Sequence, residues 1–361
     1  MSGRKQHFIP QSLLRGFGRP GKGDKIQVVV YTYERGIFTA ATDGIGAERN
    51  FYSELSVAGG DETLDDKITN YESPMSEVIA SLRQMLSGEA VESLAAAELV
   101  THLIIRNDHF RKSMSSAGSA LFGTLVGTLT EEDQARAMLG VTGDKPSAMF
   151  NDVLQEELAK VGPLLELMGM SREAFGELAY AHVQANFGAF HSEIKGPLME
   201  AFTGKEEQLA EVAASAQRKN LEKAGMSPLL RVEQLSAFRW RVAESNMTLV
   251  LPDCVAVARD GNEAMLPLML ADAGEASAVF MPVSANRVLV GSREDEQPLP
   301  DDLNEAFASC SWDFFVAPER TPELEALRAK LRSASAQFVD ETVSGAMSEV
   351  LAKNAGDEHQ G

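Results

Sequence analysis

Hydrophobic residues recur at steps of three and four through the middle of the chain, which is the spacing of amphipathic helices. The clearest case runs from Thr63 to Leu86, where Pro74 is expected to kink the helix or divide it in two. A second helix is predicted from about Ser93 to Ser115. Further helices are predicted at 130–139, 147–168, 172–194 and 205–223. The middle of the chain is therefore predicted to be helical.

Segments on either side of this helical region have the β-branched and aromatic composition of strands. Near the N-terminus, Ile26–Tyr33 and Ile37–Ala40 form a predicted hairpin around the turn at Glu34–Gly36. After Pro228, further strands are predicted at 238–243, 247–251, 255–258, 278–283, 287–290 and 312–316. The chain then ends in a predicted helix from Pro322 to about Leu351.

This order predicts an α+β fold, with one mixed sheet built from N- and C-terminal strands and packed against a central helical bundle. We expect a single domain over residues 1–355. It would contain the N-terminal motif and small β unit (5–60), the helical region (61–225), the β-rich region (228–318) and the C-terminal helix (320–353).

The opening segment from His7 to Phe17, HFIPQSLLRGF, combines a histidine, several apolar residues and a short helix. Pro10 at the start of that helix and Gly18 just past its end are typical of helix termini. Basic residues gather around it, while the whole chain has a net charge of −20. Such an acidic chain repels polyanions except near a local basic patch. The patch is either a solvated basic tail or a phosphate-facing surface beside His7.

Two cysteines without a paired spacing predict free thiols in a reducing cytoplasm. No apolar run is long enough to predict a membrane segment. The final helix carries a row of apolar residues that either packs on its own domain or forms a homodimer: Leu324, Leu327, Leu331, Phe338, Val339 and Val343. The chain shows no zinc-type cysteine spacing and no phosphate-binding glycine loop, so no organic cofactor is predicted.

Several polar residues fall on the apolar faces of the predicted helices, where burying an unpaired charge costs several kcal/mol. Glu72 projects from the first long helix, and Asn107 and Arg111 project from the second, with Arg106 at the edge of the same arc. His182 and Asn186 share the face of Ala179 and Phe190 on a later helix. These residues form either a structural network, with Glu72 paired to Arg111, or a polar pocket.

Asp253 follows Leu251-Pro252 at a predicted strand end and precedes Cys254. Turn chemistry alone accounts for an aspartate at such a position. A carboxylate at a strand end also suits a general base or a metal ligand. Both interpretations stay open from the sequence.

The segment KQHFIPQSLLRGF resembles the N-terminal signature of a large family of uncharacterised bacterial domains: His, an aromatic residue, Val or Ile, Pro, and then Leu-x-x-Phe. The outline of residues 5–293 is also similar, with Asn50-Phe51-Tyr52 after the early strands, a helix carrying a residue like Glu72, and Met281-Pro282-Val283-Ser284 late in the chain. Relatives usually have Ser-Asp before a Pro at the late site, where this chain has Pro252-Asp253-Cys254. The resemblance implies an accessory protein of bacterial genomes, with a role such as phage defence.

Two functional hypotheses follow from these residues. In the first, the chain is a hydrolase of phosphodiester or nucleotide substrates, with His7 as general acid or base and Arg111 and Arg106 stabilising transition-state charge. Glu72 would orient Arg111 or His7, and Asp253 would activate water or bind a divalent cation. Asn107, His182 and Asn186 would help to bind the small-molecule or nucleic-acid substrate. In the second hypothesis the chain is a non-catalytic module that binds a ligand or a protein.

Overall fold

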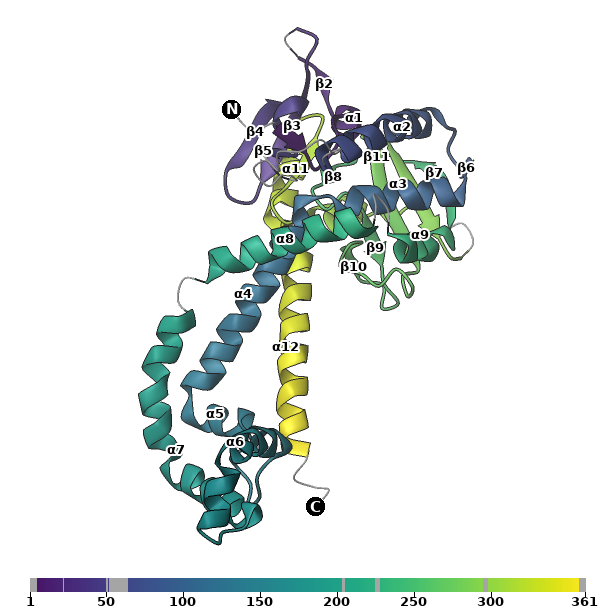
Figure 1. Ribbon diagram of the computed structural model, residues 1–361. Coiled ribbons are helices and arrows are strands. Elements are labelled where there is room, and N and C mark those ends of the chain that lie inside the picture. Colours follow the sequence, from purple (N-terminus) through teal and green to yellow (C-terminus); the bar gives the residue numbers. More distant parts are fainter. Residues whose placement is uncertain are drawn as a thin grey trace. The chain divides into compact units, whose positions relative to one another are not determined.

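The computed structural model describes residues 5–21, 23–49, 51, 64–202, 205–224, 228–294 and 298–356 (Figure 1). The chain divides into two compact units. Unit 1 contains Met1–Ser115 and Ala210–Phe338, and unit 2 contains Ser116–Leu209 and Val339–Gly361. The single domain expected from the sequence stays a prediction.

In unit 1, strands from the two ends of the chain share one five-stranded sheet in the order β2-β3-β13-β8, with β4 on β3. Its strands are β2 (Arg19–Pro20), β3 (Ile26–Thr32), β4 (Gly36–Ala41), β8 (Leu251–Pro252) and β13 (Phe314–Ala317). A separate pair joins β1 (Lys5–His7) to β5 (Ala47–Arg49), with His7 opposite Ala47. The prediction that N- and C-terminal strands meet in one sheet is therefore confirmed for this sheet.

The second large sheet of unit 1 has six strands in the order β10-β9-β11-β12-β7-β6. Its strands are β6 (Ala90–Val91), β7 (Arg239–Glu244), β9 (Val257–Arg259), β10 (Met265–Pro267), β11 (Ala278–Ser284) and β12 (Arg287–Ser292). Every pairing between described strands is antiparallel. The α+β class is confirmed, but the mixed sheet was wrong. Turns such as the one between Ser284 and Arg287 are too short for the crossover that parallel strands require.

The helices of unit 1 pack on these sheets, and α2 and α3 lie over the six-stranded sheet in Figure 1. Those that lie wholly in unit 1 are α1 (Gln11–Leu14), α2 (Leu64–Gln84), α3 (Ser93–Ile105), α9 (Leu229–Ser236), α10 (Leu303–Cys310) and α11 (Pro322–Leu327), with the short 3₁₀ turns η1 (Arg15–Phe17), η2 (Thr42–Gly44) and η3 (Arg328–Lys330). Pro74 lies inside α2, so the helix is not divided there.

The helix predicted from Ser93 to Ser115 is two helices, because α3 ends at Ile105 and α4 (Asp108–Thr130) begins after Asn107. The side chain of Asn107 explains the break. Its Oδ1 accepts a hydrogen bond from the backbone N–H of Phe110 (3.3 Å), as an N-cap does, and its Nδ2 donates to the carbonyl of Cys254 (3.1 Å). A polar residue that was assigned to a helix face therefore ends one helix and starts the next.

The described part of unit 2 is helical: α5 (Glu132–Met138), α6 (Ala148–Leu167) and α7 (Arg172–Phe202), together with parts of α4, α8 (Glu206–Ala224) and α12 (Ser333–Gly356). Ala135, Val141, Tyr180 and Phe187 form its small core. Along the C-terminal helices, Leu324, Leu331, Val339 and Val343 are buried within the chain itself. This burial gives no support to a homodimer formed through these positions.

The opening segment is part of the main core of unit 1, since Phe8, Ile9, Leu13, Leu14 and Phe17 are all buried. Burying each such side chain contributes about 1.5–3 kcal/mol. The predicted short helix is confirmed as α1 followed by η1, with Pro10 before it and Gly18 after it. Of the predicted Asn50-Phe51-Tyr52 segment, Asn50 and Tyr52 lie outside the described residues, while Phe51 is buried.

Gly16 in this segment has no room for a side chain. A Cβ atom there would lie 2.5 Å from Nη2 of Arg83 and 2.6 Å from the carbonyl oxygen of Val283. Arg83 is held in place by its own hydrogen bonds to Ser12 O (2.7 Å) and Val283 O (2.7 Å).

We expect Gly16→Ala to lower the free energy of unfolding by about 1–3 kcal/mol, because a methyl group would displace both groups. The measurement is urea unfolding followed by tryptophan fluorescence. The control is Gly44→Ala, since a Cβ at Gly44 would meet nothing within 4 Å. Equal stability of the two variants would contradict the close approach.

Candidate functional site

The centre of the candidate site is the side chain of Arg106, which lies at the end of α3 and is fully buried. Its Nη2 donates to the carboxylate of Glu72 and to the backbone carbonyl of His7. Its Nη1 lies 3.1 Å from Nε2 of His102. One guanidinium thus joins α2, α3 and strand β1. A buried charge of this kind is tolerated because an acidic partner and several hydrogen bonds accompany it.

His7 ends strand β1, and its imidazole is half-buried. Burial lowers the pKa of His7 below its ordinary value of 6.5, and the nearby carboxylate of Glu72 opposes that effect only in part. Its Nε2 is buried and has no hydrogen-bond partner among the residues that the structure describes. The imidazole is therefore neutral near pH 7 and holds a ring nitrogen that no described protein group engages.

Arg111 was the expected partner of Glu72, but Glu72 pairs with Arg106 instead. Arg111 donates to the side chain of Gln217 and to the carbonyl of Phe51, and its guanidinium carbon lies 3.5 Å from the centre of the Phe51 ring. The reason for the error is the helix break at Asn107. The break changes the direction of the chain, so Arg106 and Arg111 do not share one continuous helical surface.

Asp253 is buried at the end of β8, and its carboxylate accepts hydrogen bonds from backbone N–H groups. The N–H groups of Trp312 (2.8 Å), Asp313 (2.6 Å) and Phe314 (3.1 Å) all donate to it. Burial, reinforced by the neighbouring charge of Asp313, raises the pKa of Asp253 to about 7, despite these three donors. The carboxylate holds β8 against the start of β13.

The break between α3 and α4 connects these groups. Asn107 donates to Cys254 O, next to Asp253 in the chain. Gln217, which accepts from Arg111, donates from its Nε2 to the carbonyls of Ile105 (2.8 Å) and Asn107 (2.9 Å). Arg106 therefore contacts His7 and Glu72 directly. Arg111 is linked to the break between α3 and α4 only through Gln217, and Asp253 only through the bond of Asn107 to the neighbouring Cys254.

His182 and Asn186 lie on α7 in unit 2, and His182 is exposed. Asn186 Nδ2 donates to His182 O (2.8 Å), and the His182 ring lies 5.9 Å from that of Phe190. The predicted shared face is real, but it is not the buried one, because Tyr180, Phe187 and His191 carry the buried face of α7. The helix has apolar residues on more than one side, so periodicity selected the wrong face.

A surface pocket of about 360 Å³ lies between α1, the segment before β3 and η2. Its charged and polar lining includes Gln11, Arg15, Asp24, Lys25 and Asp43. Lys25 Nζ lies 2.9 Å from the Asp43 carboxylate, and Lys5 of β1 donates to the Asp43 carbonyl (2.7 Å). The sequence predicted a basic patch here, with Asp24 as its single acid, but it missed Asp43, since an isolated acid in a loop carries no periodic signal.

Within the described ranges, no group of three or more His, Cys, Asp and Glu side chains is arranged to hold a metal ion. Cys254 and Cys310 are free and buried. None of the helices, as far as the structure describes them, combines the length and the apolar character that crossing a membrane requires.

The fold and this geometry define an α+β protein in which the buried Arg106 joins the partly exposed residues His7 and Glu72. The chain belongs to a family of proteins of unknown function, DUF4238, whose model matches residues 5–356. That range covers nearly the whole chain, so the expected membership of an uncharacterised family is confirmed. No curated protein and no solved structure matches the chain.

Proposed function

We propose that unit 1 carries a hydrolytic site for phosphodiester or nucleotide substrates, with His7 as its general acid or base. The observation that carries this proposal is the buried Nε2 of His7, which no described protein group engages. A neutral imidazole with a free ring nitrogen can accept a proton from an attacking water. The bacterial origin and the role in phage defence rest on the family resemblance alone.

The other residues of the cluster act through His7 in this proposal. Arg106 is fully buried, so it positions the His7 backbone rather than touching substrate. Glu72, whose side chain is 29% exposed, neutralises Arg106 and favours the protonated form of His7. We assign Arg111 and Asp253 to the scaffold, because both side chains form hydrogen bonds within the protein. Arg111 donates to Phe51 O and to the side chain of Gln217, and three backbone N–H groups donate to Asp253.

We expect His7→Gln to reduce hydrolysis by about 10²–10⁴-fold while leaving thermal melting unchanged. Glutamine keeps the backbone carbonyl that Arg106 binds but cannot exchange a proton. The measurement is turnover of a panel of dinucleotides and nucleoside di- and triphosphates with Mg²⁺, Mn²⁺ or EDTA. The matched control is His182→Gln, an exposed histidine of unit 2.

The pH dependence of turnover provides a second test of the role of His7. Since the pKa of His7 is lowered, a base at this position should keep its activity as pH falls to 6.5 and lose it only at lower pH. If His7→Gln turns over substrate as fast as the wild-type protein does, His7 takes no part in the chemistry.

The second candidate is a non-catalytic module that binds a ligand or a protein. The observation in its favour is that the side chains of Arg106 and Asp253 already form hydrogen bonds with backbone groups of the protein. In that case the wild-type protein turns over no member of the panel. Substitutions at Arg106 and Asp253 would then change folding alone.

A further inference from the structure

We propose that the pocket beside His7 binds the phosphate of a single nucleotide as its Mg²⁺ complex, with Arg15 on the phosphate and Asp24 on the metal. This inference rests on the proposed function for the chemistry at His7. It adds the place where the substrate is held and the size of the substrate.

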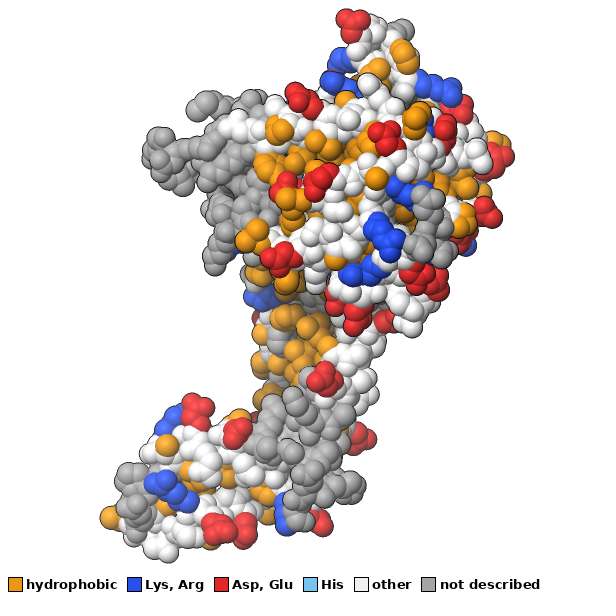
Figure 2. Space-filling view, turned by 90° about the vertical axis from the view of Figure 1, so that its right-hand side faces the viewer, with side chains coloured by type: hydrophobic (Ala, Val, Ile, Leu, Met, Phe, Trp, Pro, Cys, Tyr) orange, Lys and Arg blue, Asp and Glu red, His pale blue; other side chains and the backbone are white. Residues whose placement is uncertain are grey.

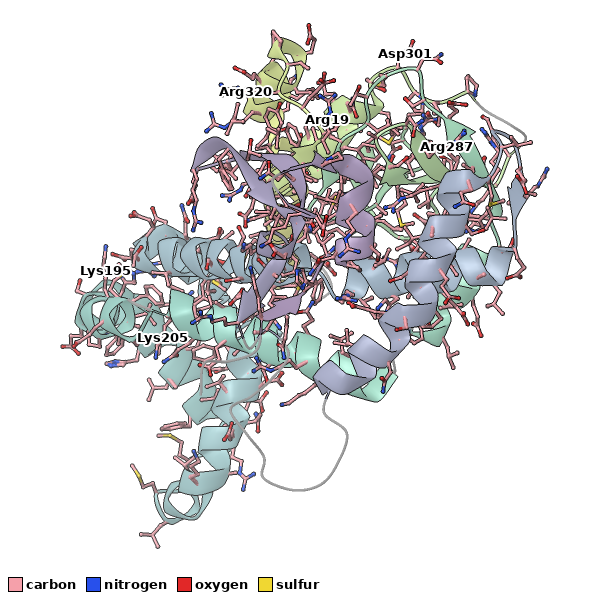
Figure 3. The ribbon with its side chains drawn as sticks, turned by 90° about the horizontal axis from the view of Figure 1, so that it is seen from above. Arg19, Lys195, Lys205, Arg287, Asp301 and Arg320 are labelled. Carbon is pink, nitrogen blue, oxygen red and sulfur yellow. The ribbon has the colours of Figure 1, made fainter. Side chains whose placement is uncertain are left out.

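The basic side chains of the opening region differ in whether they are available for an anion. Arg19 pairs with Glu319 (2.7 Å), and Figure 3 shows it beside the segment that carries Arg320. Lys25 pairs with Asp43 (2.9 Å). Among the described residues, Arg15 donates to the neutral amide of Gln11 (3.3 Å) and forms no ion pair with an acid. Arg15 is exposed and lines the pocket, so its charge has no acidic partner in the part of the chain that the structure describes.

The walls of this pocket are linked to strand β1, which ends at His7. Gln11 on one wall follows His7 by four residues. Asp43 on the opposite wall precedes Ala47 by four residues, and Ala47 pairs with His7. The hydrogen bond from Lys5 to the Asp43 carbonyl fastens this wall to strand β1. This wall of the pocket is thereby tied to strand β1, which ends at His7, although His7 itself is not among the lining residues.

The volume of the pocket and the charge of the protein limit the size of the ligand. A volume of about 360 Å³ is at the lower end of small-molecule sites. Acidic side chains are spread over the visible surface in Figure 2, in keeping with the net charge of −20. Repulsion from such a surface grows with the number of phosphates. A single nucleotide fits these limits better than a nucleic-acid strand does.

The two acidic residues of the pocket differ in their partners. Asp43 is neutralised by Lys25, whereas Asp24 has no ion-pair partner in the described part of the chain. An unshielded carboxylate beside a phosphate would oppose binding. Mg²⁺ removes that conflict, because it is commonly held by one or two carboxylates together with substrate phosphates.

The test is calorimetric binding of adenosine 5′-monophosphate to the full chain, with Mg²⁺ and with EDTA. We expect Arg15→Gln to weaken binding at least about 10-fold with unchanged melting, because a charge-assisted contact to phosphate is lost. The matched control, Arg19→Gln, should change Kd by less than about twofold. EDTA should weaken the binding of the nucleotide to the wild-type chain. Asp24→Asn should weaken the binding measured in Mg²⁺. His7→Gln should bind nearly as tightly as wild type.

The outcomes separate this inference from the proposed hydrolase. Arg15-dependent binding without turnover would support the pocket and reject the hydrolase. His7-dependent turnover with an unchanged KM in Arg15→Gln would support the hydrolase and overturn the pocket. A 20-nucleotide strand that binds more tightly than the mononucleotide would overturn the single-nucleotide assignment. Equal binding in EDTA would overturn the role of Asp24.

Discussion

Replacing Arg106 by methionine should lower the free energy of unfolding by about 3–5 kcal/mol, because it leaves the partly buried carboxylate of Glu72 without its partner. The substitution also removes the donor to the His7 carbonyl and the contact with His102. Methionine has a similar length, so lost volume contributes little. Tryptophan fluorescence during urea unfolding is a suitable measurement, since Trp240 and Trp312 are both buried in unit 1.

Two further variants show whether the ion pair is responsible. Arg35→Met changes an exposed arginine in the β3–β4 turn and should alter stability by less than about 0.5 kcal/mol. Adding Glu72→Gln to Arg106→Met should restore about 1–2 kcal/mol, because it removes the unpaired charge. If the double variant is less stable than Arg106→Met alone, Glu72 is not the group left uncompensated.

Replacing Asp253 by alanine should cost about 3–5 kcal/mol at pH 5, because three buried N–H donors lose their acceptor. The donors belong to Trp312, Asp313 and Phe314, so the register of β8 against β13 would weaken. Asp301→Ala is the matched control, since Asp301 is exposed and lies at the periphery of the molecule in Figure 3.

The cost of Asp253→Ala should shrink as pH rises. Burial raises the pKa of Asp253 to about 7 from an ordinary value of 3.8, so the folded chain binds more protons than the unfolded chain between these values. Stability from this group is then fully present below about pH 4 and is lost as pH rises toward 7, by on the order of 4 kcal/mol. A cost at pH 8 equal to or larger than the cost at pH 5 would show that the three N–H donors outweigh burial.

Local patterns were sufficient for most of the secondary structure. The steps of three and four from Leu64 onward predicted α2, and the β-branched run from Ile26 predicted β3. The opening helix followed from Pro10 and Gly18. These elements depend on neighbours within a few residues, so the sequence alone contains their causes.

Local patterns misjudged the elements that depend on distant partners. Asn107 looked like one more residue of a helix until its bond to Cys254, 147 positions away, ended that helix. Pro74 was expected to kink the helix or divide it in two, and α2 continues through it without a division. Periodicity also chose the wrong face of α7, since it cannot tell which of several apolar faces finds a neighbour.

The sequence by itself determined the α+β class, the short helix of the opening segment and the set of polar residues that needed partners, because these depend on composition and on periodicity among near neighbours. Only the tertiary structure decided which partners those residues took. Glu72 pairs with Arg106 rather than Arg111, and Asp253 receives backbone donors from Trp312 to Phe314. Pairing energies depend on distance and desolvation at each contact. Those quantities exist only once segments far apart in the chain have been brought together.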